Sequence, residues 1–141
     1  MIQAASPAPA KLKLVDSEKI TINLGFVDLG QIDLLVAEGF YGNRTDFIRT
    51  AIRNQLSTHA EAVKQVVARK MFVLGLQHFS ADDLRSVQAA GQTLQIRVLG
   101  LATIAPDVTP ELALATIDSL EVLGALQASP AVKAALASRL R

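Results

Sequence analysis

Apolar and polar residues alternate strictly over residues 19–24, and this pattern predicts a half-buried strand. The apolar face carries Ile20, Ile22 and Leu24, and the polar face carries Lys19, Thr21 and Asn23. Gly25 ends the run. The strand is therefore expected to bury one face and to present the other to solvent or to a binding partner.

After the strand, the apolar residues recur with the period of a helix. Asp28 is placed to cap a first helix that runs to about residue 38, and Gly39 stands where a helix C-terminal glycine belongs. Asn43 is placed to cap a second helix, and Asp46 completes a start that resembles a capping box. The predicted buried residues are Leu29, Ile32, Leu35 and Val36 in the first helix, and Phe47, Ile48, Ala51, Ile52 and Leu56 in the second.

A strand and two helices within residues 18–59 make too small a unit to bury a core alone. A strand without a neighbour also leaves its backbone N–H and C=O groups unsatisfied. Both problems disappear if two chains pair their strands antiparallel and interlock their helices. We therefore expect an obligate dimer with a two-stranded ribbon, which has a width that suits the major groove of DNA.

This segment resembles the ribbon-helix-helix family of bacterial regulators, and its CopG-like branch in particular. The resemblance covers residues 19–59 and is carried by Ile32-Asp33-Leu34-Leu35-Val36, Gly39, Asn43-Arg44-Thr45-Asp46-Phe47-Ile48-Arg49 and Ala51-Ile52-Arg53. It implies that Lys19, Thr21 and Asn23 point into the major groove and read base edges. Their chemistry agrees, because lysine can donate to guanine, asparagine can bond adenine at two atoms, and threonine offers a hydroxyl and a methyl group.

The resemblance also implies that the start of the second helix holds a DNA phosphate, at Gly42, Asn43, Arg44 and Thr45. A helix N-terminus attracts anions on physical grounds alone. Two interpretations of Arg44 stay open, which are a phosphate contact and an ion pair with a neighbouring carboxylate. Many family members carry more basic residues on the ribbon than the single lysine found here, which suggests that several dimers bind together.

An internal repeat follows a predicted helical connector at residues 60–70. Its copies are Val73-Leu74-Gly75-Leu76, Val98-Leu99-Gly100-Leu101 and Val122-Leu123-Gly124-Ala125, spaced 25 and 24 residues apart. Each copy precedes a helix start, at Ser80 with Asp83, at Thr109 with Pro110, and at Ser129 with Pro130. Residues 71–141 are thus predicted to form three strand-helix units with parallel strands and aligned glycines, so the whole chain is α+β. One interpretation is a solenoid-like β/α repeat domain, and the other is an ordinary three-stranded α/β fold.

Composition narrows the chemistry. The chain has 141 residues, a formal net charge of +1 and no cysteine, which excludes disulfides and thiolate chemistry. The two histidines, His59 and His78, have no ligand cluster at metal-binding spacing, and no catalytic motif occurs, so we expect no metal, no cofactor and no enzymatic activity. Residues 1–17 read as a flexible arm, and an inert tail is favoured over an arm that lies along DNA through Lys11 and Lys13. No stretch is apolar for long enough to span a membrane, and we expect a cytoplasmic protein.

Three functions fit these expectations. The first is a sequence-specific transcriptional repressor whose dimers, joined into tetramers or larger arrays through residues 71–141, bind repeated or palindromic half-sites. The second is the antitoxin of a toxin–antitoxin pair, in which the C-terminal half neutralises a protein partner. Antitoxin tails are commonly disordered and charged, whereas this half is apolar and repetitive, which favours the first function. The third is an architectural or partition protein that coats DNA.

Overall fold

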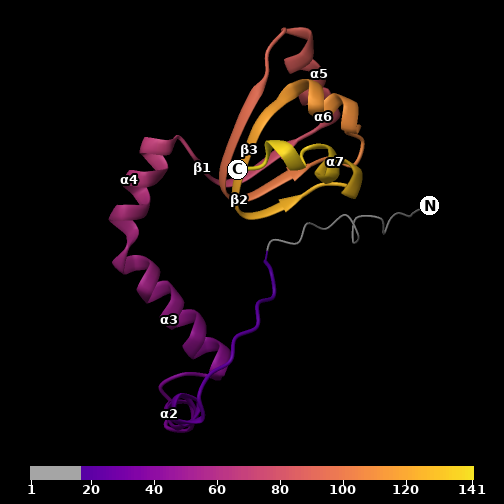
Figure 1. Cartoon of the computed structure of the whole chain (residues 1–141). Helices are drawn as coiled ribbons and strands as arrows, with labels where there is room; N and C mark the ends of the chain where they lie inside the picture. Colours follow the sequence, from indigo (N-terminus) through magenta and orange to yellow (C-terminus); the bar gives the residue numbers. More distant parts are fainter. Residues whose placement is uncertain (1–16) are drawn as a thin grey trace, which may run out of the picture. The chain divides into compact units, whose positions relative to one another are not determined.

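The structure is a computed structural model that describes residues 17–141. The chain divides into two compact units, Met1–Thr58 and His59–Arg141, here called unit 1 and unit 2 (Figure 1). The predicted N-terminal arm, with Lys11 and Lys13, lies outside the described residues except for residue 17. Within the described part of the chain, no helix is long and apolar enough to cross a membrane.

The described residues of unit 1 form the helices α2 (Phe26–Ala37) and α3 (Arg44–Thr58). Residues 17–25 have no regular secondary structure in the single chain. A strand is defined by its hydrogen bonds to a second strand, and the described residues of unit 1 contain none for this segment to pair with. The strand predicted at residues 19–24 therefore stays a prediction that concerns two chains.

The first helix begins earlier than the sequence predicts. Gly25, with extended backbone angles, is the N-cap of α2, and Asp28 lies inside the first turn. The prediction of Asp28 as the cap is wrong, although its carboxylate still lies where the helix dipole favours negative charge. The predicted end is confirmed. Gly39 has φ +87°, its N–H donates to Val36 O, and the N–H of Phe40 donates to Leu35 O, which together form a Schellman motif.

Unit 2 begins with α4 (Ala60–Lys70), which corresponds to the predicted helical connector and is separated from α3 at His59. Strands and helices then alternate as β1 (Val73–Phe79), α5 (Ala81–Ala89), β2 (Leu94–Ile104), α6 (Pro110–Thr116), β3 (Ile117–Gln127) and α7 (Pro130–Ala135), followed by the short 3-10 helix η2 (Ala137–Arg139). The three strands are parallel and lie in the order β1-β2-β3. The solenoid interpretation goes beyond this arrangement and stays a prediction.

The predicted helix starts of unit 2 are confirmed. The Ser80 hydroxyl accepts a hydrogen bond from the Asp83 N–H at 3.1 Å, and the Asp83 carboxylate accepts one from the Ser80 N–H at 2.9 Å, which makes a full capping box. These bonds favour the charged carboxylate and lower the pKa of Asp83, the backbone N–H of Ser80 contributing most. At α6 and α7 the cap is a single bond: the Thr109 hydroxyl accepts from the Leu112 N–H and the Ser129 hydroxyl from the Val132 N–H, each with proline in the first turn.

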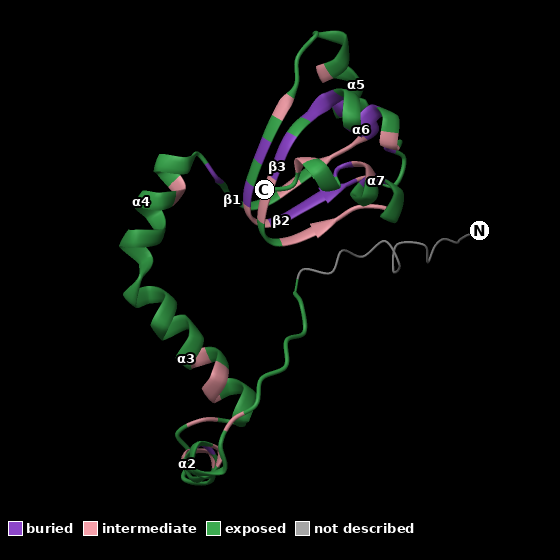
Figure 2. Ribbon diagram, in the orientation of Figure 1, coloured by how far each residue is buried: buried purple, intermediate pink, exposed green. Residues whose placement is uncertain are grey.

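One face of the sheet is covered by α5, α6 and α7, and the hydrophobic core lies between them (Figures 1 and 2). Along β2, Val98, Ala102 and Ile104 point into this core. The intervening residues Leu99 and Leu101 belong to the opposite face, as the alternation of a strand requires. The core residues are Ala81, Leu84, Ile96, Val98, Ala102, Ile104, Val108, Leu112, Ala113, Ile117, Leu120, Val132 and Leu136.

The glycines of the repeat lie side by side across the sheet, in the register Gly75–Gly100–Gly124. Their φ angles are +121°, +142° and +122°, a region that other residues rarely adopt. A Cβ atom at Gly100 would lie 2.1 Å from the carbonyl oxygen of Gly75, and one at Gly124 would lie 2.1 Å from that of Gly100. Glycine is therefore required at β2 and β3 so that the backbones can approach one another.

Replacing Gly100 with alanine should destabilise unit 2, because the new methyl group would collide with the Gly75 carbonyl in addition to straining the backbone. We expect a loss on the order of 3 kcal/mol in the free energy of unfolding, measured by urea denaturation. Gly75→Ala is the matched control, because its φ is similar but nothing lies within 4 Å of the added Cβ. Equal losses for the two variants would show that strain alone, and not the close approach, requires glycine.

Candidate nucleic-acid interface

The segment before α2 presents two chemically different sides. Ile22 and Leu24 line an apolar groove, and none of Lys19, Thr21 and Asn23 is among the residues that line it. All three of these polar residues are exposed. For Ile22 and Leu24 the division agrees with the alternation in the sequence, whereas Ile20 does not line the groove and is 71% exposed.

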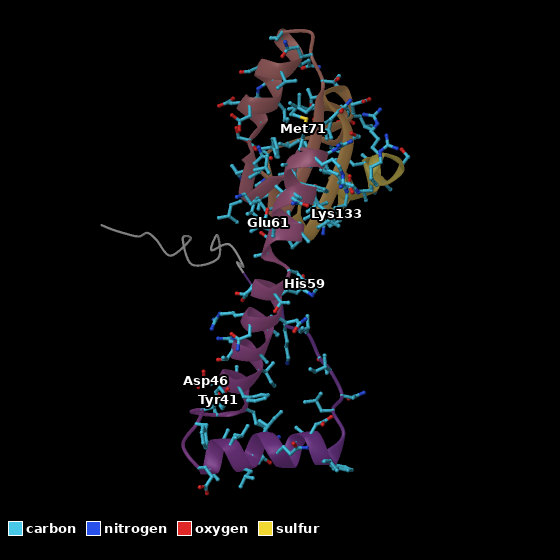
Figure 3. All side chains as sticks on the ribbon, turned by 90° about the vertical axis from the view of Figure 1, so that its left-hand side faces the viewer. Tyr41, Asp46, His59, Glu61, Met71 and Lys133 are labelled. Carbon is cyan, nitrogen blue, oxygen red and sulfur yellow. The ribbon has the colours of Figure 1, made fainter. Side chains whose placement is uncertain are left out.

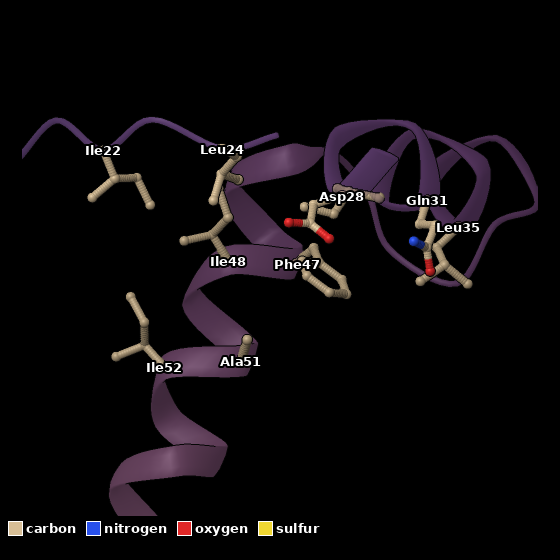
Figure 4. Close-up of a pocket in the computed structure, with 10 residues that line it drawn as sticks. Ile22, Leu24, Asp28, Gln31, Leu35, Phe47, Ile48, Ala51 and Ile52 are labelled. Atoms are coloured by element: carbon tan, nitrogen blue, oxygen red, sulfur yellow. The ribbon is translucent and has the colours of Figure 1, made fainter. Parts of the chain in front are cut away.

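The groove of unit 1 is open and almost wholly apolar. It has a volume of about 410 Å³ and lies between the extended segment, α2 and α3. Figure 4 shows Ile22 and Leu24 pointing toward α3, which presents Ile48 and Ile52 to the same space. The lining residues are Ile22, Leu24, Asp28, Gln31, Ile32, Leu35, Phe47, Ile48, Ala51 and Ile52.

Few of these side chains are buried in the single chain. Ile32 is the only buried hydrophobic residue among the described residues of unit 1. Ile22 is 60% exposed and Ile52 is 46% exposed. Apolar surface of this extent is costly in water, at about 25 cal/mol per Å². The groove is therefore an apolar surface that is left open to solvent in the single chain.

The turn between α2 and α3 confirms Asn43 as the cap of α3. The Asn43 Oδ1 atom accepts a hydrogen bond from the Asp46 N–H at 2.8 Å. The Asp46 carboxylate accepts a 2.9 Å bond from the N–H of Gly42, one residue before the position that a standard capping box uses. Tyr41 lies at the same turn as Asp46 (Figure 3), and its ring meets the edge of the Phe47 ring, with centroids 5.0 Å apart.

These bonds decide which donors remain at the start of α3. The N–H groups of Gly42 and Asp46 already have acceptors. Those of Arg44 and Thr45, in the first turn, have no acceptor among residues 17–141. Two backbone donors thus stay available for an anion at this helix end, close to the carboxylate of Asp46.

Arg44 forms a two-point ion pair with Asp33 of α2. Its Nε donates to Oδ1 of Asp33 at 2.8 Å, and its Nη2 donates to Oδ2 at 2.9 Å. The hydrogen bond from Arg44 is the largest cause that lowers the pKa of Asp33, and its positive charge acts in the same direction. Of the two interpretations of Arg44, the structure therefore shows the ion pair. Both side chains are about half exposed, so the pair is accessible to solvent and salt.

The sequence reasoning did not identify Asp33 as the partner of Arg44. The two residues are 11 positions apart and lie on different helices, so no helical spacing links them. Only the angle that the turn sets between α2 and α3 brings them together.

Unit 1 thus combines exposed polar residues on an extended segment with two helices and an open apolar groove. The protein belongs to the ribbon-helix-helix transcriptional regulator family, whose model matches residues 15–133. Members of this family bind DNA and typically dimerise. Comparisons with curated proteins and with solved structures returned no significant match.

The extent of the match changes one expectation. The resemblance in the sequence covered residues 19–59, whereas the family model continues through α4 and all three strands of unit 2. Unit 2 therefore belongs to the pattern that defines this family.

Replacing Arg44 with glutamine should raise the pKa of Asp33 toward its ordinary value of 3.8, because the bond and charge that favour the carboxylate are both removed. Because the pKa of Asp33 is lowered in the folded state, the ion pair contributes to stability at pH values above the ordinary pKa of the carboxyl group. This contribution is lost as the pH falls through the folded-state pKa. NMR titration of the side-chain carboxyl carbons measures the shift. Arg53→Gln in the same helix is the control and should leave Asp33 unchanged; an equal shift in both variants would refute a specific pair.

Proposed function

We propose that this protein is a sequence-specific DNA-binding repressor of transcription that acts as a dimer, with a two-stranded antiparallel ribbon in the major groove. The apolar groove of unit 1 is the observation that carries the proposal. It leaves the extended segment and both helices incomplete until a second chain supplies matching surfaces. Pairing of the two segments at residues 19–24 would satisfy their backbones and align the polar side chains on one ribbon face.

Base reading is assigned to Lys19, Thr21 and Asn23. The exposure of all three and their absence from the groove support this assignment. Each side chain has a suitable partner on a base edge, and direct contacts of this kind discriminate between bases by about 1–3 kcal/mol each.

Phosphate binding is assigned to the start of α3, at Gly42, Asn43, Arg44 and Thr45. The free N–H groups of Arg44 and Thr45 and the dipole of α3 favour an anion there. The N–H of Gly42 and the guanidinium of Arg44 are engaged with Asp46 and Asp33. Their use by phosphate would require exchange of these partners, which limits the affinity of a single dimer.

Unit 2 is proposed to join dimers on DNA. The weakly basic ribbon and the net charge of only +1 favour an assembly that adds the contacts of several dimers. The folded core of unit 2 favours this function over an antitoxin tail, because such tails are commonly disordered until they bind.

Footprinting distinguishes repression from the third function, which is DNA coating by an architectural or partition protein. A short discrete protected site supports repression, and progressive spreading from one site would support DNA coating.

The double substitution Thr21→Ala with Asn23→Ala should abolish specific binding and leave the thermal unfolding of the protein unchanged. Both side chains are exposed, and neither makes a hydrogen bond within the described residues. DNA selected from a random pool by the wild-type protein provides the probe, and an electrophoretic mobility shift measures the affinity. Asn54→Ala with Thr58→Ala, the same residue types on α3, should retain binding. Unfolding of the first variant would show that the predicted strand is out of register by one residue.

Raising the salt concentration should weaken binding steeply through the release of counterions. The logarithm of the binding constant should fall with the logarithm of salt at a slope of about −0.9 for each phosphate neutralised. Fluorescence anisotropy with the selected site measures this slope. A binding constant that does not change with salt concentration would contradict phosphate contacts at α3, even if the protein bound the selected DNA sequence specifically.

A further inference from the structure

Strand β1 is an edge strand with one side unpaired. β2 pairs with it in unbroken register from Val73 to Phe79, and no other described strand lies beside it. The outer N–H and C=O groups of β1 therefore form an open template for another strand.

This edge lacks the features by which proteins normally prevent edge pairing. Its sequence, Val-Leu-Gly-Leu-Gln-His-Phe, contains no lysine, no acidic residue and no proline, and its pairing with β2 shows no bulge. Leu74 is 66% exposed and Leu76 is 69% exposed on the face away from the core. Their neighbour on the same face in β2, Leu101, is only 8% exposed. The apolar side chains of this face thus extend to the edge strand, where Leu74 and Leu76 are exposed to solvent.

The opposite edge of the sheet is different. Leu140 forms a parallel bridge with Leu120 of β3, and the N–H of Arg141 donates to Leu120 O at 2.9 Å. β3 also carries the acidic residues Asp118 and Glu121 near this bridge. The β3 edge at Leu120 is therefore occupied by the chain itself, and head-to-tail stacking of β1 on β3 of another copy has only residues 122–127 to pair with.

We propose that β1 pairs antiparallel with the β1 of a second copy about a two-fold axis, and that this contact joins the dimers of the proposed function. A closed two-fold contact is the commonest kind between identical chains. A pair centred near Gly75 places Leu74 of each copy opposite Leu76 of the other, which covers the exposed leucines. Gly75 fits this position because nothing lies within 4 Å of the site of its missing Cβ, so the side facing the second strand is clear.

The oligomeric state of the full chain tests whether this contact joins dimers. Sedimentation velocity at micromolar concentration should give the wild type the mass of at least four chains of 15.0 kDa. Leu74→Lys with Leu76→Lys should reduce it to two chains and weaken the association at least about tenfold, because like charges then face each other across the pair. The control Leu114→Lys changes an exposed leucine of α6 and should leave the assembly intact.

Cross-linking tests the contact without disrupting it. The chain has no cysteine, so the double variant Leu74→Cys with Leu76→Cys introduces the only thiols and places the thiol at position 74 of each copy opposite that at position 76 of the other. This variant should form a covalent two-chain species on mild oxidation, and Leu114→Cys should not. Failure of the double variant to cross-link would overturn the β1 pair. If the cross-link forms but the wild-type protein has the mass of only two chains, the β1 contact does not join dimers, and that part of the proposal is overturned.

A further variant separates the two possible edges. Leu123→Lys changes an exposed leucine of β3 on the same face of the sheet and should leave the assembly intact. Dissociation by Leu123→Lys would overturn the two-fold β1 pair in favour of head-to-tail stacking. These measurements need no DNA. Absence of specific DNA binding together with intact assembly would therefore refute the proposed function and leave the β1 contact standing.

Discussion

The rest of the DNA-binding module depends on one constraint, which is that a single copy of unit 1 cannot bury its own apolar residues. Ile32 is its only described hydrophobic residue that is buried, whereas unit 2 encloses a continuous core between its sheet and three helices. In the proposed dimer, a second chain removes the isoleucines of the extended segment from water. Because burial of the apolar face fixes which side of the segment points outward, the same constraint orients the polar residues that are proposed to read DNA.

The positive groups and backbone donors at the start of α3 are partly engaged by carboxylates of the same chain. Asp33 engages the guanidinium of Arg44, and Asp46 engages the N–H of Gly42, so the start of α3 carries carboxylates beside its available donors. Such an arrangement weakens nonspecific attraction to phosphate more than it weakens a fitted contact, because a fitted contact retains the directed backbone donors. In the proposed complex, specific recognition would therefore rely on geometry and on the number of dimers bound.

The sequence predicted the features that depend on local patterns. The caps at Asn43, Ser80 and Thr109 and the left-handed Gly39 all follow from chemistry within a few residues, and the structure confirms them. The start of α2 was misplaced because Asp28 is also favourable inside a first turn, and position alone does not distinguish the two roles. The partner of Arg44 and the unequal edges of the sheet depend on tertiary arrangement, which no local pattern encodes. The base-reading and phosphate-binding residues stay predictions, because they concern a dimer and its DNA.

The two units have the same physical incompleteness in different forms. Unit 1 lacks partners for apolar side chains in its groove, and unit 2 lacks partners for the backbone of β1 and for Leu74 and Leu76 beside it. In the proposed assembly, a two-fold contact completes each unit, because each surface can be matched by a copy of itself. A chain with two such surfaces would pair with one neighbour through unit 1 and with a different neighbour through unit 2. The proposed assembly beyond the dimer would then use surfaces already present in one chain, and binding sites repeated along DNA would stabilise it further.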